Sequence, residues 1–139
     1  MKIEKELIYA AYEAQKYSYS PYSEFQVGAA LLGENGKVYL GCNIENAAYS
    51  PTNCAERTAI FKAVSEGCKK FKAIAIVGNK KGMTGDYCPP CGVCRQVMAE
   101  FCDPEEFQIV LARSPEEYCI YRLKDLLPCG FGKEMIEKR

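Results

Sequence analysis

The chain has 139 residues, enough for a single domain spanning 1–139 with one hydrophobic core, and its 18 Lys and Arg balance its 18 Asp and Glu. This zero net charge provides no basic stripe for a nucleic-acid partner, and it favours a small, nearly neutral ligand. The amino terminus is charged every few residues and so lacks a signal-peptide core, and the longest apolar run elsewhere is AIAIV, so we expect a soluble cytoplasmic protein without a membrane partner.

The first half of the chain has the hydrophobic pattern of a helix, two strands and a second helix. Apolar residues at helical spacing predict an amphipathic helix over residues 2–16, which the segment YSYSPYSE ends. Strands are expected over 25–32 and 37–42, and the pair Asn35-Gly36 between them suits a tight hairpin. After a polar loop over 43–53, a helix is expected over 55–66, and Gly67 would end it.

The second half alternates buried strands with one helix. The segment FKAIAIVG predicts a buried strand over 71–78, which a loop over 79–90 connects to a helix over 91–101. Two further strands are expected over 107–112 and 118–123, followed by a short turn over 124–128. The order α-β-β-α-β-α-β-β implies an α/β fold of three layers, in which helices cover both faces of a five-stranded mixed sheet.

Nine residues are cysteine and none is histidine. The odd number of cysteines and the lack of an export signal argue against a disulfide framework and favour reduced thiols, some of them on a metal. Five of the nine have no partner pattern and are interpreted as core or surface thiols: Cys42, Cys68, Cys102, Cys119 and Cys129. Without histidine, acid–base chemistry near neutral pH requires carboxylates, thiols or a metal-bound water.

Two predicted helices begin with thiols, Cys54 on one and the pair Cys91 and Cys94 on the other. The amino ends of helices in an α/β layer project from the same edge of the sheet, where their partial positive charge lowers the pKa of a thiol. Three thiolates predict a zinc site, and Glu56 could reach the open fourth position and handle a proton of the bound water. Alone, Cys54 could equally be a small buried hydrophobe, and Glu56 a solvated first-turn residue.

Two segments, CNIENAAYSPTNCAERTA and PCGVCRQV, resemble the small zinc-dependent cytidine deaminases of pyrimidine salvage, and the likeness runs from YSPYSEFQVGAALL to LLPCGFG. This resemblance implies hydrolytic deamination of cytidine and 2′-deoxycytidine to uridine and 2′-deoxyuridine, with ammonia as the second product. It also implies that Cys54, Cys91 and Cys94 hold Zn²⁺ while Glu56 shuttles protons. Arg57 would hydrogen-bond the thiolates and offset their negative charge, which otherwise raises the pKa of the bound water.

The resemblance further implies the contacts with a nucleoside substrate. The backbone N–H of Ala55 would bind the pyrimidine carbonyl, and Phe25 would pack on the base. Asn43 and Glu45 would hold the ribose hydroxyls, and the carbonyl of Pro89 would accept a hydrogen bond from the leaving amine.

The family also implies a homotetramer, in which the carboxy-terminal segment LLPCGFG closes the site of a neighbouring subunit through Phe131. The alternative for this segment is an ordinary frayed tail.

Cys88 allows two other kinds of metal site in this part of the chain. The spacing Cys88-x-x-Cys91-x-x-Cys94 also resembles the start of an iron–sulfur ligand run, and a fourth thiolate would give a closed, structural zinc site. Met98 interrupts the ferredoxin run, and the stiff Pro89-Pro90 pair is expected to point Cys88 away from the ion. A thioredoxin-like redox motif would explain neither Cys54 nor Glu56. A structural zinc module would have four thiolates and no open site, and it would leave Phe25, Asn43, Glu45 and Arg57 as coincidences. Within the deaminases, the alternative substrate is a modified cytosine nucleoside such as blasticidin S.

Overall fold

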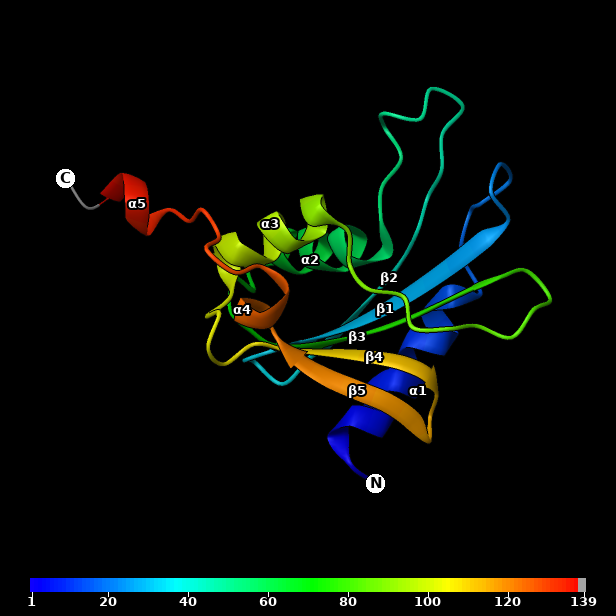
Figure 1. Ribbon diagram of the computed structural model, residues 1–139, viewed down its shortest axis with the longest axis horizontal. Helices are drawn as coiled ribbons and strands as arrows, with labels where there is room; N and C mark the ends of the chain where they lie inside the picture. The colour runs from blue at the N-terminus through cyan, green and yellow to red at the C-terminus, as the bar shows by residue number, and fades with distance from the viewer. Residues whose placement is uncertain (138–139) are drawn as a thin grey trace.

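The computed structural model describes residues 1–137 and contains one five-stranded mixed sheet (Figure 1). The strands are β1 Phe25–Gly33, β2 Val38–Cys42, β3 Phe71–Lys80, β4 Gln108–Ser114 and β5 Glu117–Arg122. The helices are α1 Ile3–Gln15, α2 Ala55–Ser65, α3 Gly92–Phe101, α4 Leu123–Leu126 and α5 Glu134–Glu137. In this part of the chain, no helix has both the length and the apolar character that crossing a membrane requires. The predicted α/β fold with a five-stranded mixed sheet is confirmed.

The strands lie in the order β2-β1-β3-β4-β5, and β3 and β4 are the one parallel pair in this sheet. A parallel pair needs a crossover connection, which the segment containing α3 supplies. The sheet has a core on each face, as the alternating side chains of β3 show. Ile74 and Ile76 pack with residues of α2 and α3, whereas Ala75 and Val77 pack with residues of α1. This alternation gives the three predicted layers.

The predicted tight hairpin between β1 and β2 is present at Asn35 and Gly36. Its loop has three residues: the N–H of Gly33 donates to the carbonyl of Lys37 at 2.9 Å, and the N–H of Gly36 donates to the carbonyl of Gly33 at 3.0 Å. Gly36 adopts the left-handed conformation with φ of 85°, while Asn35 keeps a negative φ. A type I′ turn would need positive φ at both residues, so the chain forms the next commonest hairpin instead.

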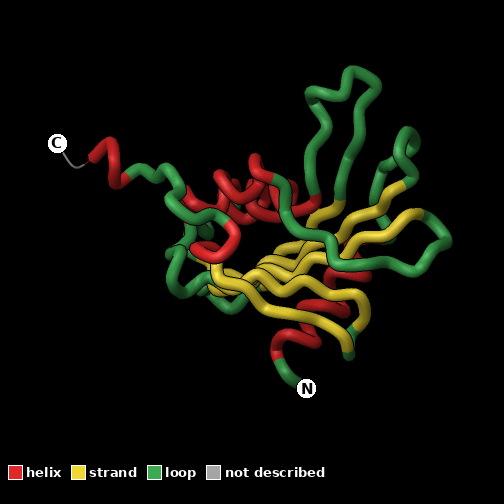
Figure 2. The backbone as a smooth tube through the Cα atoms, in the orientation of Figure 1, coloured by secondary structure: helices red, strands yellow, loops and turns green. Residues whose placement is uncertain are grey.

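The carboxy-terminal segment contains a helix that the sequence pattern did not predict. The expected turn over 124–128 is present as the short helix α4, but α5 follows it. Figure 2 shows α5 extending away from the sheet and the other helices.

Helix α2 lies directly on β2 because Gly41 has no side chain. A Cβ at Gly41 would lie 2.6 Å from the backbone nitrogen of Ala59 and would also collide with the carbonyl of Ala55. Such a close approach of two backbones is one reason for a glycine within a strand. The start of α2, with Cys54 as its N-cap and Glu56 in its first turn, is thereby fixed against the edge strand of the sheet.

Candidate metal centre

The amino ends of α2 and α3 bring three cysteine sulfurs together. Cys54 precedes α2 as its N-cap, Cys91 precedes α3 in the same way, and Cys94 lies in the first turn of α3. Their three Sγ atoms lie within 4.8 Å of one another, and those of Cys54 and Cys91 are 3.7 Å apart. None of the three forms a disulfide. The structure therefore brings together the three residues that the sequence predicted as metal ligands.

The surroundings of the three sulfurs fit a divalent ion held by thiolates. Nη2 of Arg57 donates to Sγ of Cys54 at 3.3 Å, and the backbone N–H of Cys94 donates to Sγ of Cys91 at 3.4 Å. Nε of Arg57 is buried and has no hydrogen-bond acceptor among the described residues. Donors and a fixed positive charge around soft thiolates are the environment in which a Cys₃ zinc site is stable. The three thiols thus fit Zn²⁺, the ion that the sequence predicted for them.

The thiols hold their protons unequally. The hydrogen bond from Cys94 lowers the pKa of Cys54 to about 5, and Arg57 and Cys91 add to this effect against burial. The same hydrogen bond raises the pKa of Cys94, and burial raises it further. Burial opposes the charge of Arg57, but hydrogen bonds to Cys54 and Cys94 raise the pKa of its guanidinium. A metal must therefore displace a proton from Cys94, so zinc binding releases protons and weakens in acid.

Glu56 is buried beside the sulfur cluster, with 3% of its surface exposed. Burial raises the pKa of Glu56 to about 7. A hydrogen bond from its own backbone N–H lowers the pKa, the negative charge of Cys54 raises it, and the positive charge of Arg57 lowers it. A carboxyl group with a pKa near neutrality can both accept and donate protons, which general acid–base catalysis requires. Glu56 is therefore not the solvated first-turn residue that was the alternative.

Asn43 is buried at the end of β2, where its side-chain amide is largely engaged within the chain. Its Oδ1 accepts from the hydroxyl of Ser18 and from the backbone N–H of Val27 at 3.0 Å. Its Nδ2 donates to the carbonyl of Phe25 at 2.8 Å. An amide nitrogen has two N–H groups, so one of them is left for a ligand.

Glu45 lies in the loop between β2 and α2, and residues 22–23 hold its carboxylate. Oε1 accepts from the backbone N–H groups of Tyr22 at 2.9 Å and Ser23 at 3.1 Å, and Oε2 accepts from the hydroxyl of Ser23. These hydrogen bonds, that of the Ser23 hydroxyl foremost, lower the pKa of Glu45. A pocket of about 380 Å³ opens beside Glu45, between Tyr22 and Tyr49.

Three further predicted residues lie on separate elements. Phe25 begins β1 and is 39% exposed, while Pro89 is exposed in the segment before α3. Ala55 is the first residue of α2, so its backbone N–H has no partner within the helix.

Cys88 stays outside the sulfur cluster, as predicted. Its side chain packs over Gly78, where an added Cβ would lie 2.8 Å from the Cys88 sulfur and 3.0 Å from the Phe25 ring. Burial raises the pKa of the Cys88 thiol to about 12, and the charges of Glu56 and Cys54 add to the effect. Cys88 therefore stays protonated, and among the described residues the cluster consists of three sulfurs.

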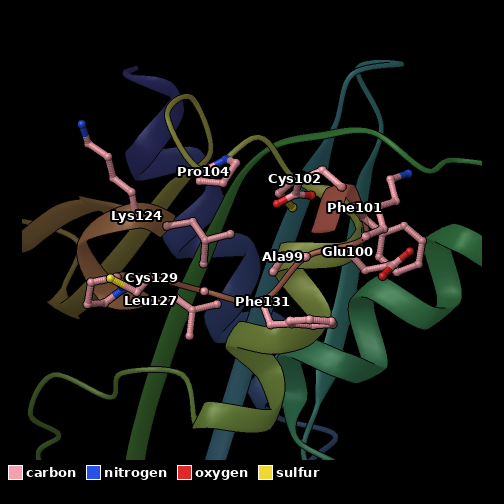
Figure 3. Close-up of a pocket in the computed structure, with 15 residues that line it drawn as sticks. Ala99, Glu100, Phe101, Cys102, Pro104, Lys124, Leu127, Cys129 and Phe131 are labelled. Atoms are coloured by element: carbon pink, nitrogen blue, oxygen red, sulfur yellow. The ribbon is translucent and has the colours of Figure 1, made fainter. Parts of the chain in front are cut away.

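Phe131 lies apart from the three cysteines of its own chain. It is 57% exposed and lines a pocket of about 430 Å³ between the carboxy-terminal half of α3 and the chain after α4 (Figure 3). Leu127 and Phe101 line the same pocket, and none of the metal-binding cysteines does.

The sequence interpretation missed Arg95 and Gln96, which both donate to the carboxy-terminal segment. Arg95 contacts the carbonyl of Leu126 at 2.7 Å, and Gln96 contacts the carbonyl of Phe131 at 2.8 Å. The available signal was their position directly after the metal ligand Cys94.

Comparisons with known proteins agree with this site. A family model described as "Cytidine and deoxycytidylate deaminase zinc-binding region" matches residues 1–110. A cytidine deaminase of Sporosarcina psychrophila is 50% identical over 134 residues, which cover 96% of this chain and 94% of that protein. A cytidine deaminase of Halalkalibacterium halodurans is 49% identical over 128 residues, or 92% of this chain and 93% of that protein.

Solved structures give the same result. The crystal structure of cytidine deaminase from Burkholderia pseudomallei is similar with a TM-score of 0.83 and 45% identity, covering 94% of this chain and 100% of that one. The crystal structure of cytidine deaminase from Mycobacterium tuberculosis has a TM-score of 0.80 and 37% identity, covering 95% of this chain and 99% of that one.

Proposed function

The chain belongs to the cytidine and deoxycytidylate deaminase family, and from this premise we propose that it is a zinc-dependent hydrolase that converts cytidine, and with it 2′-deoxycytidine, to the uracil nucleoside and ammonia. The observation that carries the proposal is the buried Glu56, whose pKa of about 7 suits proton transfer, beside three converging thiols. No histidine is present to do the same work.

Glu56 is the residue that moves protons in this proposal. Cys54, Cys91 and Cys94 would hold Zn²⁺, which would supply the Lewis acid that activates water for attack at C4 of the ring. The carboxylate of Glu56 takes up the first proton that the attacking water loses and delivers it to N3 of the ring. It then carries the second proton, from the hydroxyl formed at C4, to the amine, which leaves as ammonia. Burial of Glu56 supports this role, because a carboxyl of ordinary pKa would be a poor proton donor near neutral pH.

The pyrimidine ring is recognised by groups at the amino ends of the two helices. The N–H of Ala55 is a free helix-terminal donor for the ring carbonyl, and Phe25 offers an exposed aromatic face. The carbonyl of Pro89, in the segment that leads to Cys91, accepts a hydrogen bond from the leaving amine. A proline lacks the backbone N–H but keeps this carbonyl.

The ribose hydroxyls bind to what remains free on Asn43 and Glu45. Asn43 has one N–H without a partner among the bonds described, and Glu45 has a lone pair left on Oε2. Because Ser18, Tyr22 and Ser23 hold both side chains in place, a ribose would meet groups that are already oriented.

The substrate in this proposal is the free nucleoside. A 5′-phosphate calls for a cluster of Arg or Lys or for a run of free backbone N–H groups. The loop over 43–53, NIENAAYSPTN, contains no cation, and Glu45 would repel a phosphate.

Ammonia release from cytidine, cytidine monophosphate and single-stranded DNA, measured side by side with one preparation, tests the proposal. We expect efficient deamination of cytidine alone. If the nucleotide or the DNA is deaminated as efficiently, the proposed sugar pocket is wrong; if no substrate is deaminated by zinc-loaded protein, the proposed function is wrong.

Assembly into a homotetramer, in which Phe131 closes the site of a neighbour, is part of the same proposal. Two observations support it: Phe131 is exposed and apart from its own sulfur cluster, and α5 extends away from the sheet (Figure 2). A cytoplasmic location is also proposed. All nine cysteines lie in the described part of the chain and none forms a disulfide, as is usual in reducing compartments.

A further inference from the structure

The guanidinium of Arg95 joins the backbone before α3 to the carboxy-terminal turn. Its Nε donates to the carbonyl of Pro90 at 2.7 Å, and its Nη1 donates to the carbonyl of Leu126, also at 2.7 Å. The side chain is partly buried and makes no ion pair with any residue in 1–137. The two backbone carbonyls are thus the acceptors that the structure gives to this cation.

The carbonyl of Pro90 lies between two groups of the candidate site, the carbonyl of Pro89 and the side chain of Cys91. Pro90 lies between Pro89 and Cys91 in the sequence. Its two backbone dihedral angles, φ and ψ, therefore set the direction of the Pro89 carbonyl relative to the metal ligand Cys91. The proline ring fixes φ. The remaining dihedral is ψ, and the carbonyl of Pro90 turns with it. A hydrogen bond that holds this carbonyl therefore fixes both the direction of the Pro89 carbonyl and the placement of Cys91.

We propose that Arg95 is a positioning residue for deamination. It holds residues 89–91 so that the sulfur of Cys91 stays at the cluster and the carbonyl of Pro89 faces the leaving amine. The part that concerns the amine rests on the proposed function, whereas the part that concerns Cys91 requires only the metal site. The contact with Leu126 matters because it holds the other side of the same planar guanidinium in place.

The chemistry of the side chain explains why arginine serves here. A guanidinium presents several N–H groups in a fixed plane, so it can bind two carbonyls at once without bending. A lysine carries one compact ammonium on a flexible stem, so it does not hold two carbonyls in the fixed directions that a planar guanidinium does. The substitution Arg95→Lys should therefore keep the charge and lose part of the alignment.

Gln96 provides a matched control on the same helix. It is exposed, and it also donates to a carbonyl of the carboxy-terminal segment, that of Phe131 at 2.8 Å. No hydrogen bond joins it to the described residues 89–91. Figure 3 shows Phe131 and Leu127 at the pocket where this segment returns over α3. Gln96→Ala therefore removes one contact with the segment and leaves the backbone before Cys91 untouched.

The test compares Arg95→Met, which keeps the aliphatic stem, with Arg95→Lys and Gln96→Ala. Zinc affinity is measured by competition with a chromogenic chelator, and kcat and KM are measured with cytidine. For Arg95→Met we expect zinc affinity and kcat each to fall by about 10- to 100-fold, as is usual when a residue that orients a ligand is lost. The KM should change little, because Arg95 does not bind the substrate. Arg95→Lys should be intermediate, and Gln96→Ala should keep wild-type zinc affinity.

The outcomes separate this inference from the proposed function. The inference is wrong if folded Arg95→Met keeps wild-type zinc affinity and kcat, or if Gln96→Ala causes the same loss of zinc affinity. If Arg95→Met does not fold, the zinc affinity of Arg95→Lys tests the inference instead. A zinc affinity equal to that of the wild type would overturn it. If the wild type does not deaminate cytidine but Arg95→Met loses zinc affinity, the positioning of Cys91 stands and the proposed function falls.

Discussion

Replacing Glu56 by Gln removes the buried carboxyl group and keeps its shape. The amide can neither take up nor release a proton, and no histidine can substitute for it. General acid–base catalysis contributes about 10²- to 10⁴-fold to a rate, so kcat should fall by that factor, equivalent to about 3 to 5 kcal/mol in the barrier. Zinc content should stay at the wild-type level, because the three thiols are unchanged.

The same substitution should also change stability, in a direction that the pKa of Glu56 dictates. This carboxyl has an ordinary pKa of 4.5 and a pKa of about 7 in the folded chain. Between these values the folded state binds more protons than the unfolded state, so stability falls as pH rises through the window. At about 1.4 kcal/mol per pH unit, ionisation of Glu56 costs zinc-free protein about 3 kcal/mol above pH 7.

Because Gln does not titrate, zinc-free Glu56→Gln should be more stable than zinc-free wild type at a pH of about 8 by up to about 3 kcal/mol. For a chain of this length, this corresponds to a rise of about 10 °C in Tm. At pH 5 the two proteins should melt at similar temperatures.

Thermal melts of chelator-treated protein at both pH values measure this effect, and the loss of cytidine absorbance measures kcat. The control is Glu66→Gln, which changes an exposed carboxyl at the other end of α2. A Glu56→Gln protein that retained most of its activity, or that melted like wild type at pH 8, would refute the assignment of a buried proton carrier.

Three other predictions test separate parts of the structure. Cys91→Ser should release zinc and abolish activity, whereas Cys88→Ser should keep one zinc per chain, as metal analysis can show; loss of zinc from the latter would identify a fourth ligand. Gly41→Ala should lower the free energy of unfolding by about 1 to 3 kcal/mol in urea titrations, because the new methyl group pushes α2 off the sheet. Truncation after Pro128 should lower activity with little change in the circular dichroism spectrum, and a fully active truncated monomer would contradict the role of Phe131.

The sequence predicted most of the fold because its elements have regular periods. Helices α1, α2 and α3 and all five strands were expected within a few residues of their bounds, since each carries an apolar pattern of helical or strand spacing. The three-residue loop of the hairpin at Asn35 was not predicted, because hairpin geometry depends on the pairing register of the strands, which that residue pair does not determine. The helix α5 was missed because it is short and has no buried residue. The single-domain organisation stays a prediction.

The candidate site, like the fold, could be predicted only in part from the sequence. The convergence of Cys54, Cys91 and Cys94 beside Glu56 could be predicted, because helix starts and residue spacing are local properties. The burial that raises the pKa of Glu56 could not, since it depends on how α2 packs on the sheet. Nor could the contacts of Arg95, because Leu126 lies far along the chain and only the folded structure brings it near. The substrate contacts at Asn43 and Glu45 stay proposals.

The most direct test is the rate of cytidine deamination by one purified sample before zinc removal, after it, and after zinc is restored. We predict that activity disappears with the metal and returns in full when one zinc per chain is bound to the three thiols. Undiminished deamination by the zinc-free protein, or none by the fully loaded protein, would contradict the account.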